Sequence, residues 1–123
     1  MRAVTEAPAA EDMYEKNAPR PPRFTMPLEA RLELREFQPA HLESRLVPIG
    51  DPAMNVEWFK DGQPIRIGTR FRPTYEFSYV ALDILWSYPE DSGTYYAVAT
   101  NLVGTDSTSR AELRCTGTDT LID

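Results

Sequence analysis

Only a few residues of this 123-residue chain combine a catalytic or metal-binding type with a neighbour at a spacing that could do chemistry. A serine beside a histidine can act as a nucleophile with its general base, and Ser44 follows the single histidine, His41, by three residues. Histidine and cysteine bind zinc, and the chain has one of each, His41 and Cys115. Paired carboxylates such as Glu90–Asp91 can do acid–base work. Each possibility depends on the strand or turn that holds the residue.

The local pattern argues against all of this chemistry. His41 is out of phase with its apolar neighbours and should face solvent, whereas Ser44 faces the other side of the same strand. His41 and Cys115 lie far apart in the chain, and two ligands are too few for a zinc site. Glu90–Asp91 belongs to a turn, and the turns lack the spacing of a calcium loop. We therefore expect no catalytic residue, no metal site and no cofactor.

Alternating polar and apolar residues from Phe24 onward predict an all-β domain. Six segments place apolar residues at alternate positions, with Ser44 as a polar member of one set, which is the pattern of strands with one buried face. They are "EARLEL", "AHLESRL", "MNVEWF", "YVALDI", "TYYAVAT" and "SRAELRC". Turn residues separate them in "GDP", "KDGQP", "PEDSG" and "NLVG". Many short strands without a helical period indicate a sandwich or a barrel.

The composition favours an intracellular protein. With 13 basic and 19 acidic residues the net charge is −6, which argues against a main role in neutralising phosphates. One cysteine cannot form an intramolecular disulfide, and the three asparagines lack the glycosylation motif. The first twenty residues have no apolar core like that of a secretory signal, and no apolar run is long enough to span a membrane. Together these features are typical of a reducing compartment.

A tryptophan and a tyrosine carry a family resemblance. Trp58 precedes "KDG", and Tyr95 lies in "DSGTYYA", two residues before Ala97. The spacing of Ser44, Trp58 and Ala97 is that of Cys–Trp–Cys in an immunoglobulin domain, with both cysteines replaced. With "PPRFTMPL", "GDPAMNVEWFKDGQPI" and "DSGTYYAVATNLVG", the chain resembles the intermediate-set (I-set) immunoglobulin domains of the giant sarcomeric proteins of the titin family. "RFRPTYEFSYVALDILWSYPEDSG" is similar, more narrowly, to modules of the kettin (Sallimus) type.

The resemblance implies an immunoglobulin-like, two-sheet Greek-key sandwich without a disulfide. Tyr95 would form a tyrosine corner, with its hydroxyl bonded to backbone just upstream. Ser44 would need a backbone carbonyl for its buried hydroxyl. Asp91 would pair with Arg70 or Arg72. The core residues are expected to be Ser44, Trp58, Leu82, Tyr95 and Ala97.

The chain is expected to divide into three parts. Residues 1–21, rich in Ala, Glu and Pro, are expected to be a linker or disordered N-terminal extension, with a spacer or peptide-ligand role as the alternative. Residues 22–115 would form the I-set domain, and residues 116–123 a C-terminal tail or linker. If the ends near Phe24 and Arg114 pair in parallel, pulling on the termini would shear several hydrogen bonds at once.

Four basic side chains and one tryptophan are the expected protein-binding patch: Lys60, Arg66, Arg70, Arg72 and Trp86. Trp86 lies inward at the rim if its strand continues, and is exposed if the strand has ended. A solvated rim is the simpler interpretation of the four cations in a chain of charge −6. The kettin resemblance instead implies weak binding to an acidic filament, filamentous actin.

The function implied by the resemblance is architectural. The chain would be a spacer module of a muscle filament protein that links thin filaments to the Z-disc, located in the cytoplasm at the Z-disc or I-band. Its partners would be actin and neighbouring immunoglobulin modules, without nucleic acid or membrane, and the isolated module would be a monomer. The alternative is an extracellular adhesion or receptor domain with a protein ligand. The missing disulfide and glycosylation sites weigh against that alternative.

Overall fold

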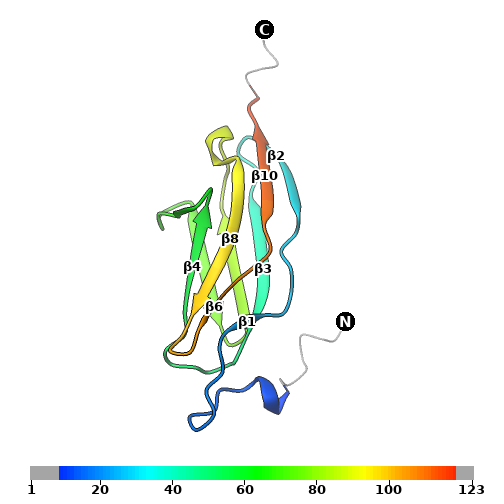
Figure 1. Cartoon of the computed structure of the whole chain (residues 1–123). Coiled ribbons are helices and arrows are strands. Elements are labelled where there is room, and N and C mark those ends of the chain that lie inside the picture. The colour runs from blue at the N-terminus through cyan, green and yellow to red at the C-terminus, as the bar shows by residue number, and fades with distance from the viewer. Residues whose placement is uncertain (1–8, 119–123) are drawn as a thin grey trace.

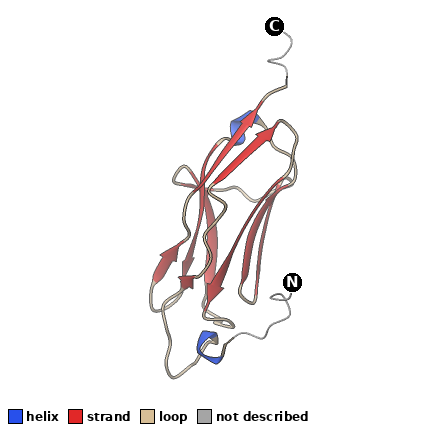
Figure 2. Ribbon diagram, turned by 90° about the vertical axis from the view of Figure 1, so that its right-hand side faces the viewer, coloured by secondary structure: helices blue, strands red, loops and turns tan. Residues whose placement is uncertain are grey.

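Two β-sheets packed face to face form the computed structural model, which describes residues 9–118 (Figures 1 and 2). The first sheet contains, in spatial order, β1 (Arg23–Phe24), β3 (Ala40–Val47), β7 (Tyr79–Ile84) and β6 (Phe71–Glu76). The second contains β2 (Arg31–Arg35), β10 (Ala111–Thr116), β8 (Gly93–Thr100), β4 (Asn55–Lys60) and β5 (Gln63–Pro64), with β9 (Thr105–Ser107) paired to β8. Two short 3-10 helices are η2 (Ala10–Asp12) and η3 (Pro89–Asp91). The predicted all-β sandwich is confirmed.

Strand alternation places one side of each sheet in the core. In β3, the residues at every second position from Ala40 to Leu46 are buried, and β10 shows the same alternation from Ala111 to Cys115. Because side chains of a strand point to opposite faces in turn, the polar residues between them reach the outer faces of the sandwich. β7 departs from this rule, since Ala81 is buried on the outer face between two neighbouring strands.

The expected parallel pairing is present, but its partner strand is not the one at Phe24. Arg114 of β10 lies opposite Glu33 of β2 in a parallel pair, whereas Phe24 of β1 pairs antiparallel with Leu46 of β3. The condition is therefore not met at Phe24, because the chain changes sheets between β1 and β2. Leu28, buried in the crossing segment, packs into the core there.

The "KDG" turn forms a tight hairpin between β4 and β5. Asp61 and Gly62 both have positive φ, 52° and 84°. A two-residue hairpin turn of this twist needs both central residues in the left-handed region, which aspartate tolerates and glycine adopts freely. The predicted turn is therefore explained by its two residue types.

The core contains all five residues expected there. Trp58, Leu82, Tyr95, Ala97 and Ser44 are each at most 3% exposed. The Tyr95 hydroxyl donates a 2.6 Å hydrogen bond to the backbone carbonyl of Asp91, which is the geometry of a tyrosine corner. The Ser44 hydroxyl donates to the carbonyl of Met26 at 2.5 Å, so its burial leaves no unmet hydrogen bond. Within residues 9–118, the indole N–H of Trp58 meets no acceptor.

Candidate protein-binding surface

Arg70 lies just before β6 and is held by the fold. Its guanidinium donates to both carboxylate oxygens of Asp91, at 2.6 and 3.1 Å, and to the backbone carbonyl of Trp86 at 2.9 Å. It also stacks on the rings of Phe71 and Tyr88, at 4.9 and 4.7 Å from their centroids. The hydrogen bond with Asp91 raises the pKa of Arg70 above its usual range. Of the two arginines expected to pair with Asp91, Arg70 is the one that forms the pair in the structure.

Lys60 and Trp86 lie beside the same short helix, η3. The Lys60 ammonium donates a 2.6 Å hydrogen bond to the carbonyl of Glu90. Trp86 is half-buried, because β7 has ended at Ile84, and its indole N–H donates to the Tyr88 hydroxyl at 3.1 Å. The structure therefore gathers Lys60, Arg70 and Trp86 around η3.

Arg66 and Arg72 stand apart from this group. Arg66 lies in the exposed segment between β5 and β6, and Arg72 lies on β6 opposite Asp83 of β7. Among residues 9–118, neither side chain has a hydrogen-bond or ion-pair partner. The expected patch is thus divided. Lys60 and Arg70 are hydrogen-bonded to residues of η3, whereas Arg66 and Arg72 are exposed along the β5–β6 side of the sandwich.

A polar cluster on the outer face of the first sheet was missed in the sequence. His41 of β3 lies between two carboxylates, with Nδ1 2.6 Å from Asp83 of β7 and Nε2 2.8 Å from Glu43. The Tyr79 hydroxyl donates to Glu43 at 3.3 Å, and Arg45 stacks over the Tyr79 ring. Alternation predicted that His41 faces solvent, but only the register of β3 with β7 brings Asp83 beside it.

The electrostatics of this cluster favour a charged imidazole. The hydrogen bond that His41 donates to Asp83 raises the pKa of His41, and the hydrogen bond between His41 and Glu43 lowers the pKa of Glu43. Ser44, the candidate nucleophile, faces the core on the other side of the strand, as predicted. The cluster therefore forms an ion-pair network on the surface and has no nucleophile beside its histidine.

Neither a metal centre nor a membrane helix emerges from the described residues. Between residues 9 and 118, no group of three or more histidine, cysteine, aspartate or glutamate side chains could hold a metal ion. No helix in this part of the chain has the length and apolar character needed to cross a membrane.

Comparison with known proteins gives one family match and many relatives. The immunoglobulin I-set domain family matches residues 22–114. Titin of Drosophila melanogaster is 44% identical over 107 residues, which is 87% of this chain and 1% of that protein. The muscle M-line assembly protein unc-89 of Caenorhabditis elegans is 38% identical over 91 residues, 72% of this chain and 1% of that protein. The chain thus spans about 1% of the length of each of these two relatives.

Solved structures agree with the family match. The crystal structure of the titin domains z1z2 in complex with telethonin aligns with a TM-score of 0.68 at 34% identity. The alignment covers 80% of this chain and 48% of that one. This chain is therefore similar to a titin domain both in its fold and in its sequence.

Proposed function

Because this chain belongs to the immunoglobulin I-set family, we propose that it is a structural module of a giant muscle filament protein. In this role it is a folded spacer, of the kettin type, that helps to link thin filaments to the Z-disc in the cytoplasm of muscle cells. Its similarity to titin and to a muscle M-line assembly protein supports a sarcomeric location. A module of this kind has no catalytic task.

The parallel pairing of β2 with β10 is the observation that best supports a mechanical role. Five residue pairs join the two strands, from Arg31–Glu112 to Arg35–Thr116. β10 ends at the opposite end of the molecule from the N-terminal segment (Figure 1). A pull on the two ends of the chain therefore loads these strands along their length. In that geometry the hydrogen bonds of the pair must break together rather than one after another.

Single-molecule stretching in two directions tests this role. One geometry pulls through the two chain ends and shears β2 against β10. The other pulls through Pro39→Cys, in the exposed turn after β2, and through the C-terminal end. Both points lie at the end where the parallel strands β2 and β10 finish, so this pull separates the two strands one hydrogen bond at a time from that end. We expect a clearly higher unfolding force in the first geometry. Equal forces in both would contradict a mechanical role for the pair.

Weak binding to filamentous actin is the second part of the proposal. Arg66 and Arg72 are the exposed, unpaired cations of the expected patch on the described part of the chain. Exposed charges contribute little singly, and screening limits their reach to about 10 Å at 0.1 M salt. One module should therefore bind feebly, and many modules in series would bind firmly by raising each other's effective concentration.

Co-sedimentation with actin at increasing salt tests the binding surface. Reversing both free cations, with Arg66→Glu and Arg72→Glu, should abolish salt-sensitive pelleting without unfolding the module. Arg31→Glu with Arg35→Glu is the matched control, because these exposed arginines lie on β2, at the other edge of the sandwich. Equal loss of binding in both pairs would mean that net charge, and not this surface, governs pelleting.

Contacts with other protein domains are part of the same proposal. The titin fragment to which the chain is similar was solved in complex with telethonin, so related modules present surfaces to protein partners. For this chain we expect neighbouring immunoglobulin modules as partners, and a monomer when the module is isolated. Sedimentation of the purified module at several concentrations tests the monomeric state.

A further inference from the structure

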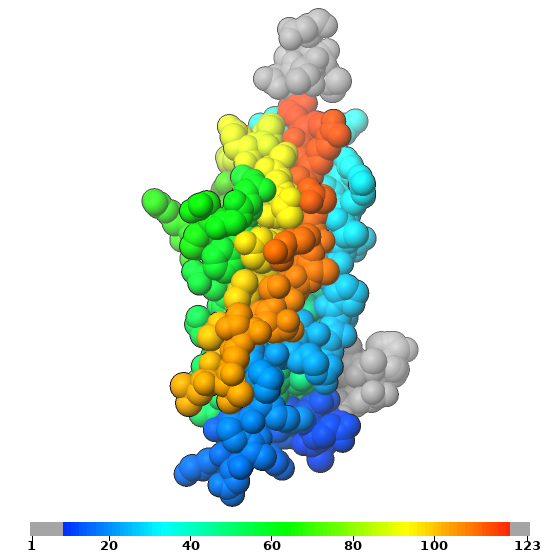
Figure 3. All heavy atoms as spheres, in the orientation of Figure 1, coloured from blue at the N-terminus to red at the C-terminus, as the bar shows by residue number. Residues whose placement is uncertain are grey.

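The N-terminal arm, which we define as residues 9–21, folds back onto the sandwich. Met13 forms a parallel bridge with Ile49, the residue that follows β3 by two positions. The amide of Tyr14 donates to the carbonyl of Ile49 at 2.8 Å, and the amide of Ile49 donates to the carbonyl of Asp12 at 2.7 Å. In Figures 1 and 3 the arm, in blue, covers the end of the molecule opposite β10's last residue. The expected linker is thus attached to the domain in its described part.

A second contact fastens the other end of the arm. The side-chain amide of Asn101, in the turn between β8 and β9, donates to the carbonyl of Arg20 at 2.7 Å and to Asp51 at 2.9 Å. The Arg20 guanidinium donates to the carbonyl of Met13 at 3.1 Å. The arm is therefore a closed loop, tied to the body at Ile49 and at Asn101.

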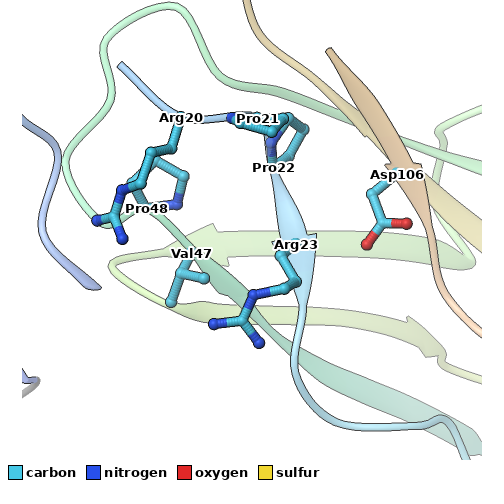
Figure 4. Close-up of a pocket in the computed structure, with 7 residues that line it drawn as sticks. All are labelled: Arg20, Pro21, Pro22, Arg23, Val47, Pro48 and Asp106. Atoms are coloured by element: carbon cyan, nitrogen blue, oxygen red, sulfur yellow. The ribbon is translucent and has the colours of Figure 1, made fainter. Parts of the chain in front are cut away.

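No residue of the arm belongs to the hydrophobic core cluster. Met13 is 40% exposed, although its backbone makes the bridge. Where the arm enters β1, an open hollow of about 430 Å³ remains beside Val47 and Pro48. Figure 4 shows Arg20 to Arg23 on one side of this hollow and Asp106 on another. Hydrogen bonds that are partly open to solvent contribute about 1 kcal/mol or less each, so the arm should detach at a lower load than the core strands.

We propose that the arm is a releasable reserve of length in series with the module. A pull on the N-terminal side reaches the bridge at Ile49 before it reaches β1. Two backbone hydrogen bonds hold that bridge, and one side-chain hydrogen bond from Asn101 to the carbonyl of Arg20 holds the other end of the arm, whereas β2 and β10 share five residue pairs. Release leaves the sandwich intact and frees the eight residues from Tyr14 to Pro21, which span roughly 28 Å when extended. The mechanical use of the arm rests on the proposed function, but its attachment to Ile49 does not.

Hydrogen exchange of single amides tests the attachment without any load. In the unaltered chain the amides of Tyr14 and Ile49 should be protected. Tyr14→Pro removes the donor to Ile49 and should speed exchange of the Ile49 amide by about tenfold or more, with core amides unchanged. Lys16→Pro is the matched control, since it adds a proline two residues away in a turn and leaves the bridge intact. Unprotected amides in the unaltered chain, or no effect of Tyr14→Pro, would overturn the attachment.

Stretching through the chain ends tests the reserve of length. We expect a reversible extension of up to about 28 Å at low force, before the sandwich unfolds, in the unaltered chain and in Lys16→Pro. Tyr14→Pro should lack this step and unfold at the same force as the others. If the early step is absent while the main unfolding event persists, the reserve is refuted and the proposed module function stands. If the main event shows no shear resistance, the proposed function fails whatever the arm does.

Discussion

Arg70 and Asp91 form an ion pair that joins the approach to β6 to η3, with the guanidinium on both carboxylate oxygens at 2.6 and 3.1 Å. The Asp91 side chain is 7% exposed and that of Arg70 is 22% exposed. Asp91 also accepts the backbone amide of Tyr88 at 2.7 Å, and its own carbonyl accepts the Tyr95 hydroxyl. This pair therefore belongs to the structural framework and is poorly placed to serve as an actin contact.

Removal of the arginine should destabilise the module. Arg70→Ala leaves a nearly buried carboxylate without its cation, and we expect a loss of about 3 kcal/mol in the free energy of unfolding. Arg66→Ala, which removes an exposed cation without a partner in residues 9–118, should change it by less than about 0.5 kcal/mol. Urea unfolding of both variants is the measurement. An Arg70→Ala midpoint equal to that of the unaltered chain would refute the structural role.

Truncation of the central tryptophan should leave the module largely unfolded. Trp58 is 3% exposed and packs in the main core cluster, so Trp58→Ala should cost about 3–5 kcal/mol. Trp58→Phe should cost less, since it keeps an aromatic ring and removes a buried N–H without an acceptor in the described structure. Amide dispersion in NMR spectra at room temperature compares the two variants. A well-dispersed spectrum from Trp58→Ala would show that the core does not depend on this ring.

Reducing conditions should not affect stability. The sequence has a single cysteine, and Cys115 is buried at the end of β10. The positions that carry the disulfide in other immunoglobulin domains are Ser44 and Ala97, which are both fully buried. We expect the same melting temperature with and without excess reductant. A drop that Cys115→Ala abolishes would instead indicate a disulfide between two molecules.

Stability should depend on pH through His41. Asp83 raises the pKa of this histidine in the folded state above its usual value of about 6.5. The resulting stabilisation is therefore complete below about pH 6.5 and is lost as the pH rises through the raised pKa. Glu43 has a lowered pKa, so its contribution is present above its usual pKa and is lost as the pH falls through the lowered one.

Denaturant unfolding from acid to alkaline pH measures this effect. Since the cluster is exposed, we expect the unaltered chain to exceed His41→Gln by about 0.2–1 kcal/mol in mildly acidic solution. The difference should shrink at alkaline pH. A difference that stays constant across this range would mean that His41 contributes through packing and not through its charge.

The sequence by itself predicted six of the ten strands of the described residues, the five named core residues and the turn chemistry of "KDG", whereas β5, β6 and β9 were not among its alternating segments. The predicted features depend on local rules: alternation fixes which side of a strand is buried, and Asp61–Gly62 fits a tight hairpin without help from the rest of the chain. The spacing of Trp58 and Tyr95 also indicated the immunoglobulin family, because both residues occupy core positions that the fold requires.

Only the tertiary structure decided which side chains meet across strands. The register of β3 with β7 places Asp83 beside His41. The path of the chain before β6 brings Arg70, rather than Arg72, within hydrogen-bonding distance of Asp91. The crossing between β1 and β2 moved the parallel pair away from Phe24, and the contact of Met13 with Ile49 joined the arm to the domain. A strand's own residues encode its faces, whereas register and long-range contacts depend on the packing of the whole chain, and no single segment carries that information.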